Sequence, residues 1–138
     1  VYLLDTNVVS ELRRIRPHGA VLAWLNGVEP GQLHLSAVTL GEIQAGVEIT
    51  RKQNAIRAAE IETWLDQVAA TYSVVSLDGR VFRLCAKLMH GRADSLYEDA
   101  LIAATANVHG LIVVTRNVRD FRRLGAPTLN PFQAMGAP

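Results

Sequence analysis

The stretch Tyr2-Leu3-Leu4-Asp5-Thr6-Asn7 joins a short apolar run to three polar residues, and a helical pattern follows it. This order predicts the first strand of an α/β sheet, buried and ending at Leu4. In open α/β sheets, ligands bind at the carboxyl ends of the strands. Asp5 is therefore expected at the mouth of a crevice, where its charge can serve a function.

Strand-like and helix-like segments alternate along the rest of the chain. Apolar residues at i, i+3, i+4 and i+7 predict helices, and short apolar runs predict strands, with the continuous, mostly β-branched run 111–114 typical of a strand buried on both faces. Because the two kinds alternate, we expect an α/β/α sandwich with a mostly parallel central sheet. The expected strands are 1–4, 33–35, 73–76, 111–114 and 128–129; the expected helices are 8–14, 17–28, 38–47, 53–70, 81–88 and 97–108, with 115–120 as a loop or short turn.

Polar residues at several expected helix starts predict side-chain caps. Thr6 or Asn7 can cap helix 8–14, and Ser36 can cap the helix that follows strand 33–35. Ser95 and Glu98 have the spacing of a capping box, which predicts the start of helix 97–108.

The length of 138 residues suits one domain, which we expect at 1–132 with a flexible tail at 133–138. Hydrophobic residues make up 49% and charged residues 20%, which excludes a disordered chain. No apolar run approaches the roughly 20 residues that cross a bilayer, so no membrane partner is expected. The single cysteine, Cys85, cannot form an internal disulfide and suits a reducing cytoplasm.

The charges nearly balance, with 14 Lys and Arg against 13 Asp and Glu, for a net charge of +1. This argues against a protein that coats nucleic acid by charge alone. The arginines recur in clusters, however, and clusters beside the crevice could hold phosphates. Solvated helix faces are the plainer interpretation of any one cluster. The last cluster contains Arg116, Arg119, Arg122 and Arg123.

Four acidic residues follow or flank the expected strand ends, and each has an ordinary structural explanation. Asp5 can cap a helix, and Glu42 can complete a capping box with Thr39. Asp99 lies in a first helical turn, where the helix dipole favours a carboxylate by roughly 0.3–1 kcal/mol. Asp120 can be a surface residue in a basic loop.

Taken together, the acids point to a divalent cation. Two carboxylates about 4 Å apart repel by roughly 4 kcal/mol at an effective dielectric near 20. Several such groups would rival the total stability of a domain unless a cation compensates them. Hard oxygen ligands select Mg²⁺ or Mn²⁺, and the four scattered histidines lack the spacing of a zinc site. We expect Asp5 and Asp99 to bind the ion directly.

The chemistry that follows is hydrolysis of a phosphodiester by water that the ion activates. Glu42 would orient the attacking water, while Thr115, Asn117 or Asp120 would complete the surroundings of the metal. No G-x-S-x-G segment or glycine-rich phosphate loop offers another chemistry.

Small residues stand one helical turn after two of the acids: Gly46 follows Glu42, and Ala103 follows Asp99. Little bulk beside an acid leaves room for an ion and a phosphate. Tight packing of the helices on the sheet would explain the same residues.

Five segments, in this order, carry a family resemblance: Leu4-Asp5-Thr6-Asn7, Ser36-Ala37-Val38-Thr39-Leu40-Gly41-Glu42-Ile43 with Gly46, Asp99-Ala100-Leu101-Ile102-Ala103-Ala104-Thr105-Ala106, Thr115-Arg116-Asn117 with Asp120-Phe121, and Asn130-Pro131-Phe132. The first four resemble the PIN-domain family, and within it the VapC/FitB-type toxins of bacterial toxin–antitoxin pairs, a group that the fifth segment also matches. The resemblance covers the chain from Val1 to about Phe132.

The resemblance implies a Mg²⁺- or Mn²⁺-dependent endoribonuclease that forms a homodimer. It also implies a cognate VapB/FitA-like antitoxin, whose C-terminal segment covers the acidic pocket and whose other end binds promoter DNA. Asp5, Glu42 and Asp99 match the three central acids of the family. Many relatives have Asp where this chain has Asn117, so either Asn117 or Asp120 completes the site, with one ion or two.

Two other classes of α/β protein have acidic pockets. A phosphate-receiving module would need a lysine at a late strand end, but Lys52 and Lys87 both lie in helical stretches. An aspartyl phosphatase would need a second Asp at position 7, where Asn7 stands. A non-catalytic binding module stays open, and a chelator would leave its binding undisturbed.

Overall fold

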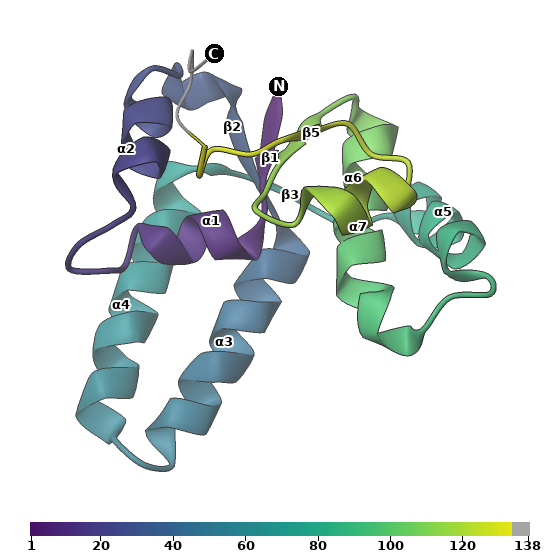
Figure 1. Cartoon of the computed structure of the whole chain (residues 1–138). Helices are drawn as coiled ribbons and strands as arrows, with labels where there is room; N and C mark the ends of the chain where they lie inside the picture. The colour runs from purple at the N-terminus through teal and green to yellow at the C-terminus, as the bar shows by residue number, and fades with distance from the viewer. Residues whose placement is uncertain (134–138) are drawn as a thin grey trace.

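The computed structural model describes residues 1–133, and within them five parallel strands form one sheet in the order β3-β2-β1-β4-β5 (Figure 1). The strands are β1 (Tyr2–Leu4), β2 (Leu33–Ser36), β3 (Ser73–Val75), β4 (Ile112–Val114) and β5 (Thr128–Leu129). The predicted parallel α/β sheet is confirmed. Of the predicted tail, residues 134–138 lie outside the described part.

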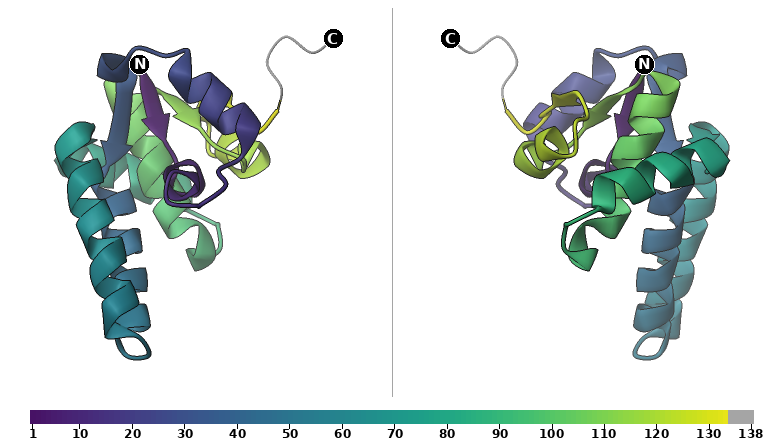
Figure 2. Two further views of the ribbon diagram at one scale, coloured as in Figure 1. Left: turned by 90° about the vertical axis from the view of Figure 1, so that its left-hand side faces the viewer. Right: turned by 90° about the vertical axis from the view of Figure 1, so that its right-hand side faces the viewer.

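Helices cover both faces of the sheet (Figures 1 and 2). None of them, within residues 1–133, is long and apolar enough to cross a membrane. Their bounds are α1 (Thr6–Glu11), α2 (Gly19–Asn26), α3 (Ala37–Arg51), α4 (Ala55–Thr71), α5 (Gly79–Met89), α6 (Tyr97–His109) and α7 (Val118–Arg123), with the 3₁₀ turns η1 (Pro30–Gln32) and η2 (Asp94–Leu96).

The side-chain alternation of the central strands divides the core into two layers. Leu3 and Val113 pack on one face of the sheet in a cluster with residues of α5, α6 and α7. Leu4 and Val114 pack on the other face with residues of α1, α2 and α4. All four side chains have no exposed surface, so β1 and β4 occupy the centre of the molecule.

Helices α3 and α4 form an antiparallel hairpin that projects beyond the sheet (Figures 1 and 2). The Asn54 side chain caps α4 by accepting a hydrogen bond from the Arg57 N–H at 3.0 Å. Between the helices, Glu62 pairs with Arg51 at 3.0 Å and accepts a hydrogen bond from Gln44 at 2.8 Å.

One cap prediction is confirmed, and another differs in the residue that forms the cap. Ser36 caps α3 as predicted, by accepting from the Val38 N–H. Helix α1 begins earlier than predicted, at Thr6, with Asp5 and not Thr6 or Asn7 as its cap. The chain turns into the helix directly at the strand end, because the Asp5 carboxylate accepts the first free N–H.

Two predictions near the end of the chain are wrong. The Ser95–Glu98 capping box is absent: Ser95 lies inside η2, and α6 begins after Leu96 without a side-chain cap. The backbone turn of η2 leads into α6 instead, as the Tyr97 N–H donates to the Asp94 carbonyl. The predicted loop 115–120 contains the start of α7, because the Phe121 side chain is buried against α6 in the core.

Candidate active site

Asp5 stands directly after β1 at the centre of the sheet and is only 6% exposed. Its backbone N–H donates to the Val114 carbonyl at 2.9 Å, which extends the pairing of β1 with β4. Its carboxylate accepts from the Thr6 N–H at 2.8 Å, from Asn7 Nδ2 at 3.1 Å and from Thr115 Oγ1 at 2.7 Å. Burial raises the pKa of Asp5 against the lowering effect of these donors. Asp5 is therefore both a helix cap and a rigidly held acid.

Thr115 joins Asp5 to the segment that follows β4. Its hydroxyl donates to Asp5 and accepts from the Asn117 N–H at 2.9 Å. The residue is fully buried, and its own N–H donates to the Leu129 carbonyl of β5 at 2.9 Å. Thr115 thus fixes the start of this segment relative to the acid.

Asn117 connects two further predicted site residues. Its Nδ2 donates to Asp120 Oδ2 at 2.9 Å and to Asp99 Oδ2 at 3.4 Å. Burial raises the pKa of Asp99 to about 6, and repulsion from Asp5, Asp120 and Glu98 adds to the effect. The amide of Asn117 therefore bridges two carboxylates, and one of them, Asp99, lies within electrostatic reach of Asp5.

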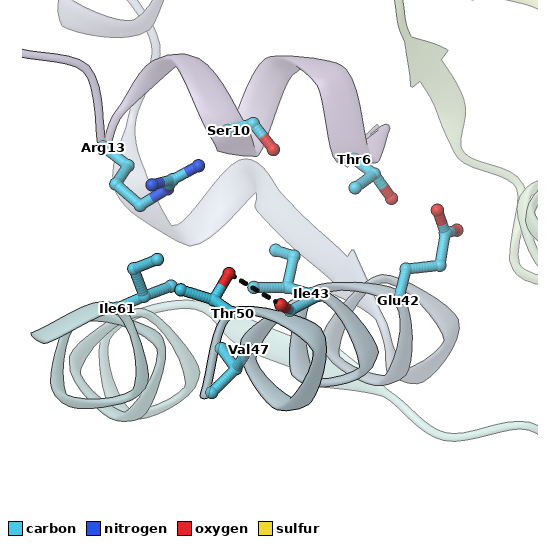
Figure 3. A pocket seen from close by; sticks show the side chains of 9 residues that line it. Thr6, Ser10, Arg13, Glu42, Ile43, Val47, Thr50 and Ile61 are labelled. Carbon is cyan, nitrogen blue, oxygen red and sulfur yellow. Dashed lines mark hydrogen bonds between the residues drawn. The ribbon is translucent and has the colours of Figure 1, made fainter. Parts of the chain in front are cut away.

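Glu42 extends from α3 toward Thr6 of α1 (Figure 3). Burial raises its pKa to about 7, and repulsion from Glu98 and Asp5 contributes. The alternative capping box with Thr39 is absent, because the cap of α3 is Ser36, three residues before Thr39. Glu42 is thus free of a capping role and faces the other acids.

The structure adds two residues that the sequence analysis did not place in the site. Glu98 raises the pKa of both Glu42 and Asp99, so it lies near both. Its position directly before Asp99 was a usable signal, but the capping-box pattern explained it differently. Asn7 donates to Asp5 and accepts from the Arg116 N–H at 3.4 Å, which links α1 to the segment after β4.

The acids share one region without forming a closed ligand shell. Within residues 1–133, no three acidic, histidine or cysteine side chains gather into a group that could hold a metal ion. Hydrogen bonds join Asp5 to Thr115, and Asn117 to Asp99 and Asp120. Glu42 interacts with Glu98 and Asp5 by charge repulsion, which raises its pKa.

A cavity of about 270 Å³ lies between α1, α3 and α4, with Glu42 at one end and Arg13 at the other (Figure 3). Gly46 lines it, and a Cβ added there would meet no atom within 4 Å. The missing side chain at Gly46 therefore keeps space open. Ala103, in contrast, is fully buried in the core, so its small size serves helix packing.

Residues 2–127 match the family described as the PIN domain. The chain is 32% identical to the "VapC ribonuclease Y4jK" of Sinorhizobium fredii, over 95% of this chain and 97% of that protein. It is 33% identical to the "Toxin FitB" of Neisseria gonorrhoeae, over 94% of this chain and 97% of that one.

The fold is also similar to a solved structure, the crystal structure of FitAcB from Neisseria gonorrhoeae. The TM-score is 0.84 at 30% sequence identity, covering 96% of this chain and 99% of the other. The parallel sheet, the acids at its carboxyl edge and these similarities agree with one another. The chain belongs to the PIN-domain family.

Proposed function

We propose that this protein is a metal-dependent endoribonuclease that acts in the cytoplasm as the toxin of a toxin–antitoxin pair. One observation carries the proposal: at partly buried acids by the carboxyl edge of the sheet, burial and then repulsion from neighbouring acids raise the pKa, to about 7 at Glu42 and about 6 at Asp99. Such repulsion is relieved by a cation. Membership of the PIN family and similarity to a VapC ribonuclease support RNA as the substrate. The nuclease domain would comprise residues 1–132.

The donors present fit Mg²⁺ or Mn²⁺. Both ions prefer oxygen ligands, and Mg²⁺ keeps several waters and binds through one or two carboxylates plus substrate phosphates. Separate carboxylates facing one region suit that preference better than a closed protein shell would. Asp5 and Asp99 would hold the ion directly, and Asp120 or Asn117 would complete its surroundings.

The chain's own residues have distinct roles in this reaction. When bound, the ion would lower the pKa of water and offset the negative charge of the phosphate. Glu42, whose pKa is raised by burial and by the neighbouring acids, would orient the attacking water. Thr115 keeps Asp5 in position, and Asn117 keeps Asp99 and Asp120 together.

The partner would be a VapB- or FitA-like antitoxin, with promoter DNA bound only through that antitoxin, and the toxin itself would be a homodimer. Similarity to FitB and to the FitAcB structure supports this part of the proposal. The cavity that runs from Glu42 to Arg13 offers a place for an antitoxin segment beside the acids.

Growth of a bacterial host tests the toxin function. Expression of the chain alone should arrest growth, and co-expression with the short gene expected immediately upstream should restore it. Asp5→Asn should abolish the arrest at equal protein level, whereas substitution of an exposed acid on α4, Asp66→Asn, should not. Harmless expression of the unmodified chain would contradict the toxin assignment.

Purified protein tests the nuclease function. RNA cleavage should require added Mg²⁺ or Mn²⁺, stop with a chelator and resume when the ion is restored. Cleavage that a chelator does not affect would refute the metal-dependent mechanism. Partner binding that survives the chelator, without any cleavage, would favour a non-catalytic binding module.

Asn117→Asp tests which residue completes the metal site. The substitution replaces a neutral amide by a third carboxylate beside Asp99 and Asp120, so calorimetry should show tighter Mg²⁺ or Mn²⁺ binding. The metal-free variant should also melt at a lower temperature, because two hydrogen bonds are replaced by repulsion. Unchanged metal affinity would assign the role to Asp120 instead.

A further inference from the structure

Arg116 lies in the segment that carries the site and has an unusual contact. It stands between Thr115, which bonds to Asp5, and Asn117, which bonds to Asp99. Its guanidinium Cζ lies 3.9 Å from the centroid of the Phe132 ring. Among residues 1–133, no carboxylate forms an ion pair with Arg116.

The aromatic ring that holds Arg116 is itself fixed. Phe132 packs against the core on the α1–α2 face, and its N–H donates to Asn130 Oδ1 at 2.9 Å. The His18 ring meets it edge-on, with 5.3 Å between the ring centroids. Because the ring is placed by the core, it can position the guanidinium, and the cation–π attraction adds to that hold.

The guanidinium of Arg116 stacks on an aromatic ring and, among residues 1–133, pairs with no carboxylate. A long arginine side chain close to several carboxylates gains energy by pairing with one of them. Such a pair would occupy both the acid and the guanidinium donors. With Arg116 stacked on Phe132, the acids stay available to a cation and the planar N–H groups stay available to an external anion.

We propose that Arg116, held by Phe132, binds a backbone phosphate of the RNA next to the cleaved bond. This inference rests on the proposed nuclease function. An acidic site repels the polyanion that it must bind, so a cation at its rim is needed to hold the strand. Arginine donors match phosphate oxygens two at a time. The backbone N–H of Arg116 donates to the Asn7 side chain, and that side chain donates to Asp5. The backbone at Arg116 is therefore linked to the acid.

Steady-state cleavage of a labelled single-stranded RNA tests the role of the charge. Arg116→Gln should raise KM about tenfold with kcat little changed, as expected for loss of a charge-assisted hydrogen bond. The KM of Arg116→Lys should lie between those of the wild type and Arg116→Gln, because an ammonium keeps the charge but lacks the planar pair of donors. The matched control is Arg119→Gln, which removes the same charge from the neighbouring α7 and should change KM much less.

A second pair of variants tests the ring. Phe132→Leu retains an apolar side chain but removes the π face, and it should raise KM about threefold, whereas Phe132→Tyr should restore the wild-type value. In NMR spectra, the Arg116 side-chain protons should show ring-current shifts that disappear in Phe132→Leu and persist in Phe132→Tyr. Equal KM values for the Leu and Tyr variants would overturn the positioning role.

Other results would also overturn the inference. Equal increases in KM for Arg116→Gln and Arg119→Gln would mean that RNA binding depends on overall positive charge and not on the position of Arg116. If Arg116→Gln weakened antitoxin binding but not KM, the anion would be a carboxylate of the partner.

A binding measurement separates this inference from the proposed function. Fluorescence anisotropy can follow binding of the same RNA to Asp5→Asn, with and without Arg116→Gln. Normal cleavage by Arg116→Gln would refute this inference alone. If the wild type bound the RNA through Arg116 but never cleaved it, the nuclease function would be refuted and the phosphate site would be retained. Absence of both binding and cleavage would refute both.

Discussion

Asp5 combines contacts that favour its charge with surroundings that oppose it. Three donors hold the carboxylate, and one of these bonds caps α1. Burial opposes the charge, and Asp5 in turn raises the pKa of Asp99 and Glu42. An asparagine at this position keeps an oxygen acceptor for the cap while it removes the charge, so stability and function can be separated at this residue.

We expect Asp5→Asn to reduce RNA cleavage by more than about a hundredfold, because the substitution would remove a proposed direct ligand of the ion. Without metal, its melting temperature should equal or exceed that of the wild type, because repulsion is relieved. Gel-based cleavage and thermal unfolding in chelator measure the two effects. Asp66→Asn on α4 serves as the control and should change neither. A marked fall in melting temperature would show that Asp5 is chiefly structural.

The raised pKa values of Glu42 and Asp99 predict how stability depends on pH. Their values of about 7 and about 6 exceed the ordinary 4.5 and 3.8, so the folded state binds protons more tightly than the unfolded state. The free energy of unfolding of the metal-free protein should therefore decline as the pH rises from about 4 to 7. Metal binding requires the ionised acids and should strengthen over the same range.

Urea denaturation at several pH values, with chelator and with Mg²⁺, measures this effect. Added Mg²⁺ should stabilise the protein more at pH 8 than at pH 5. Glu42→Gln should flatten the metal-free profile, because it removes the group with the higher pKa. A metal-free stability that rises between pH 4 and 7 would contradict the predicted electrostatics.

Not every polar residue at the start of a helix caps that helix. Asn54 accepts the Arg57 N–H at the start of α4, whereas Ser95 caps nothing, because η2 leads directly into α6. We therefore expect Asn54→Ala to lower the free energy of unfolding by about 1 kcal/mol. Ser95→Ala should lie within about 0.5 kcal/mol of wild type, as for most surface substitutions.

Chemical denaturation of both variants measures this difference under one condition. The two residues are exposed, so lost packing does not confuse the comparison. Equal costs for the two substitutions would mean that Ser95 does cap α6 in solution, as its sequence spacing suggested.

The order of the strands decides where the site forms. β1 lies between β2 and β4, and both pairings are parallel. Asp5 and Thr115 are therefore adjacent although 110 positions separate them along the chain. Helix α3, which follows β2, brings Glu42 to the same edge.

For the whole molecule, the near-balance of charge predicts a modest dependence of RNA binding on salt. The net charge is +1, so few phosphates should be neutralised, and each contact with single-stranded RNA contributes a slope of about −0.7 in log K against log salt. Anisotropy titrations of Asp5→Asn in increasing KCl measure the slope. Arg116→Gln should make the slope less steep by about 0.7, the contribution of one phosphate contact. A steep slope that Arg116→Gln leaves unchanged would indicate binding by a broad basic surface.

Much of the fold was predictable because it depends on local pattern. Apolar spacing located the helices, and short apolar runs located the strands, of which only 111–114 is a continuous, mostly β-branched run. Helix α6 ends at His109, one residue beyond the predicted end, and its cap is Gly110, whose φ of 67° suits a residue without a side chain. The errors lie at helix starts, where Ser95 and Glu98 had the right spacing but the backbone of η2 took their place.

The sequence by itself determined which residues could serve the site, because local pattern places Asp5 after a strand, Asp99 in the first turn of a helix and Glu42 within the helix after another strand. Only the tertiary structure decided which of them meet. Hydrogen bonds such as Thr115 to Asp5 and Asn117 to Asp99 depend on strand order and helix packing, which no local pattern encodes. The stacking of Arg116 on Phe132 was invisible for the same reason: a side chain's partners are set by neighbours far along the chain.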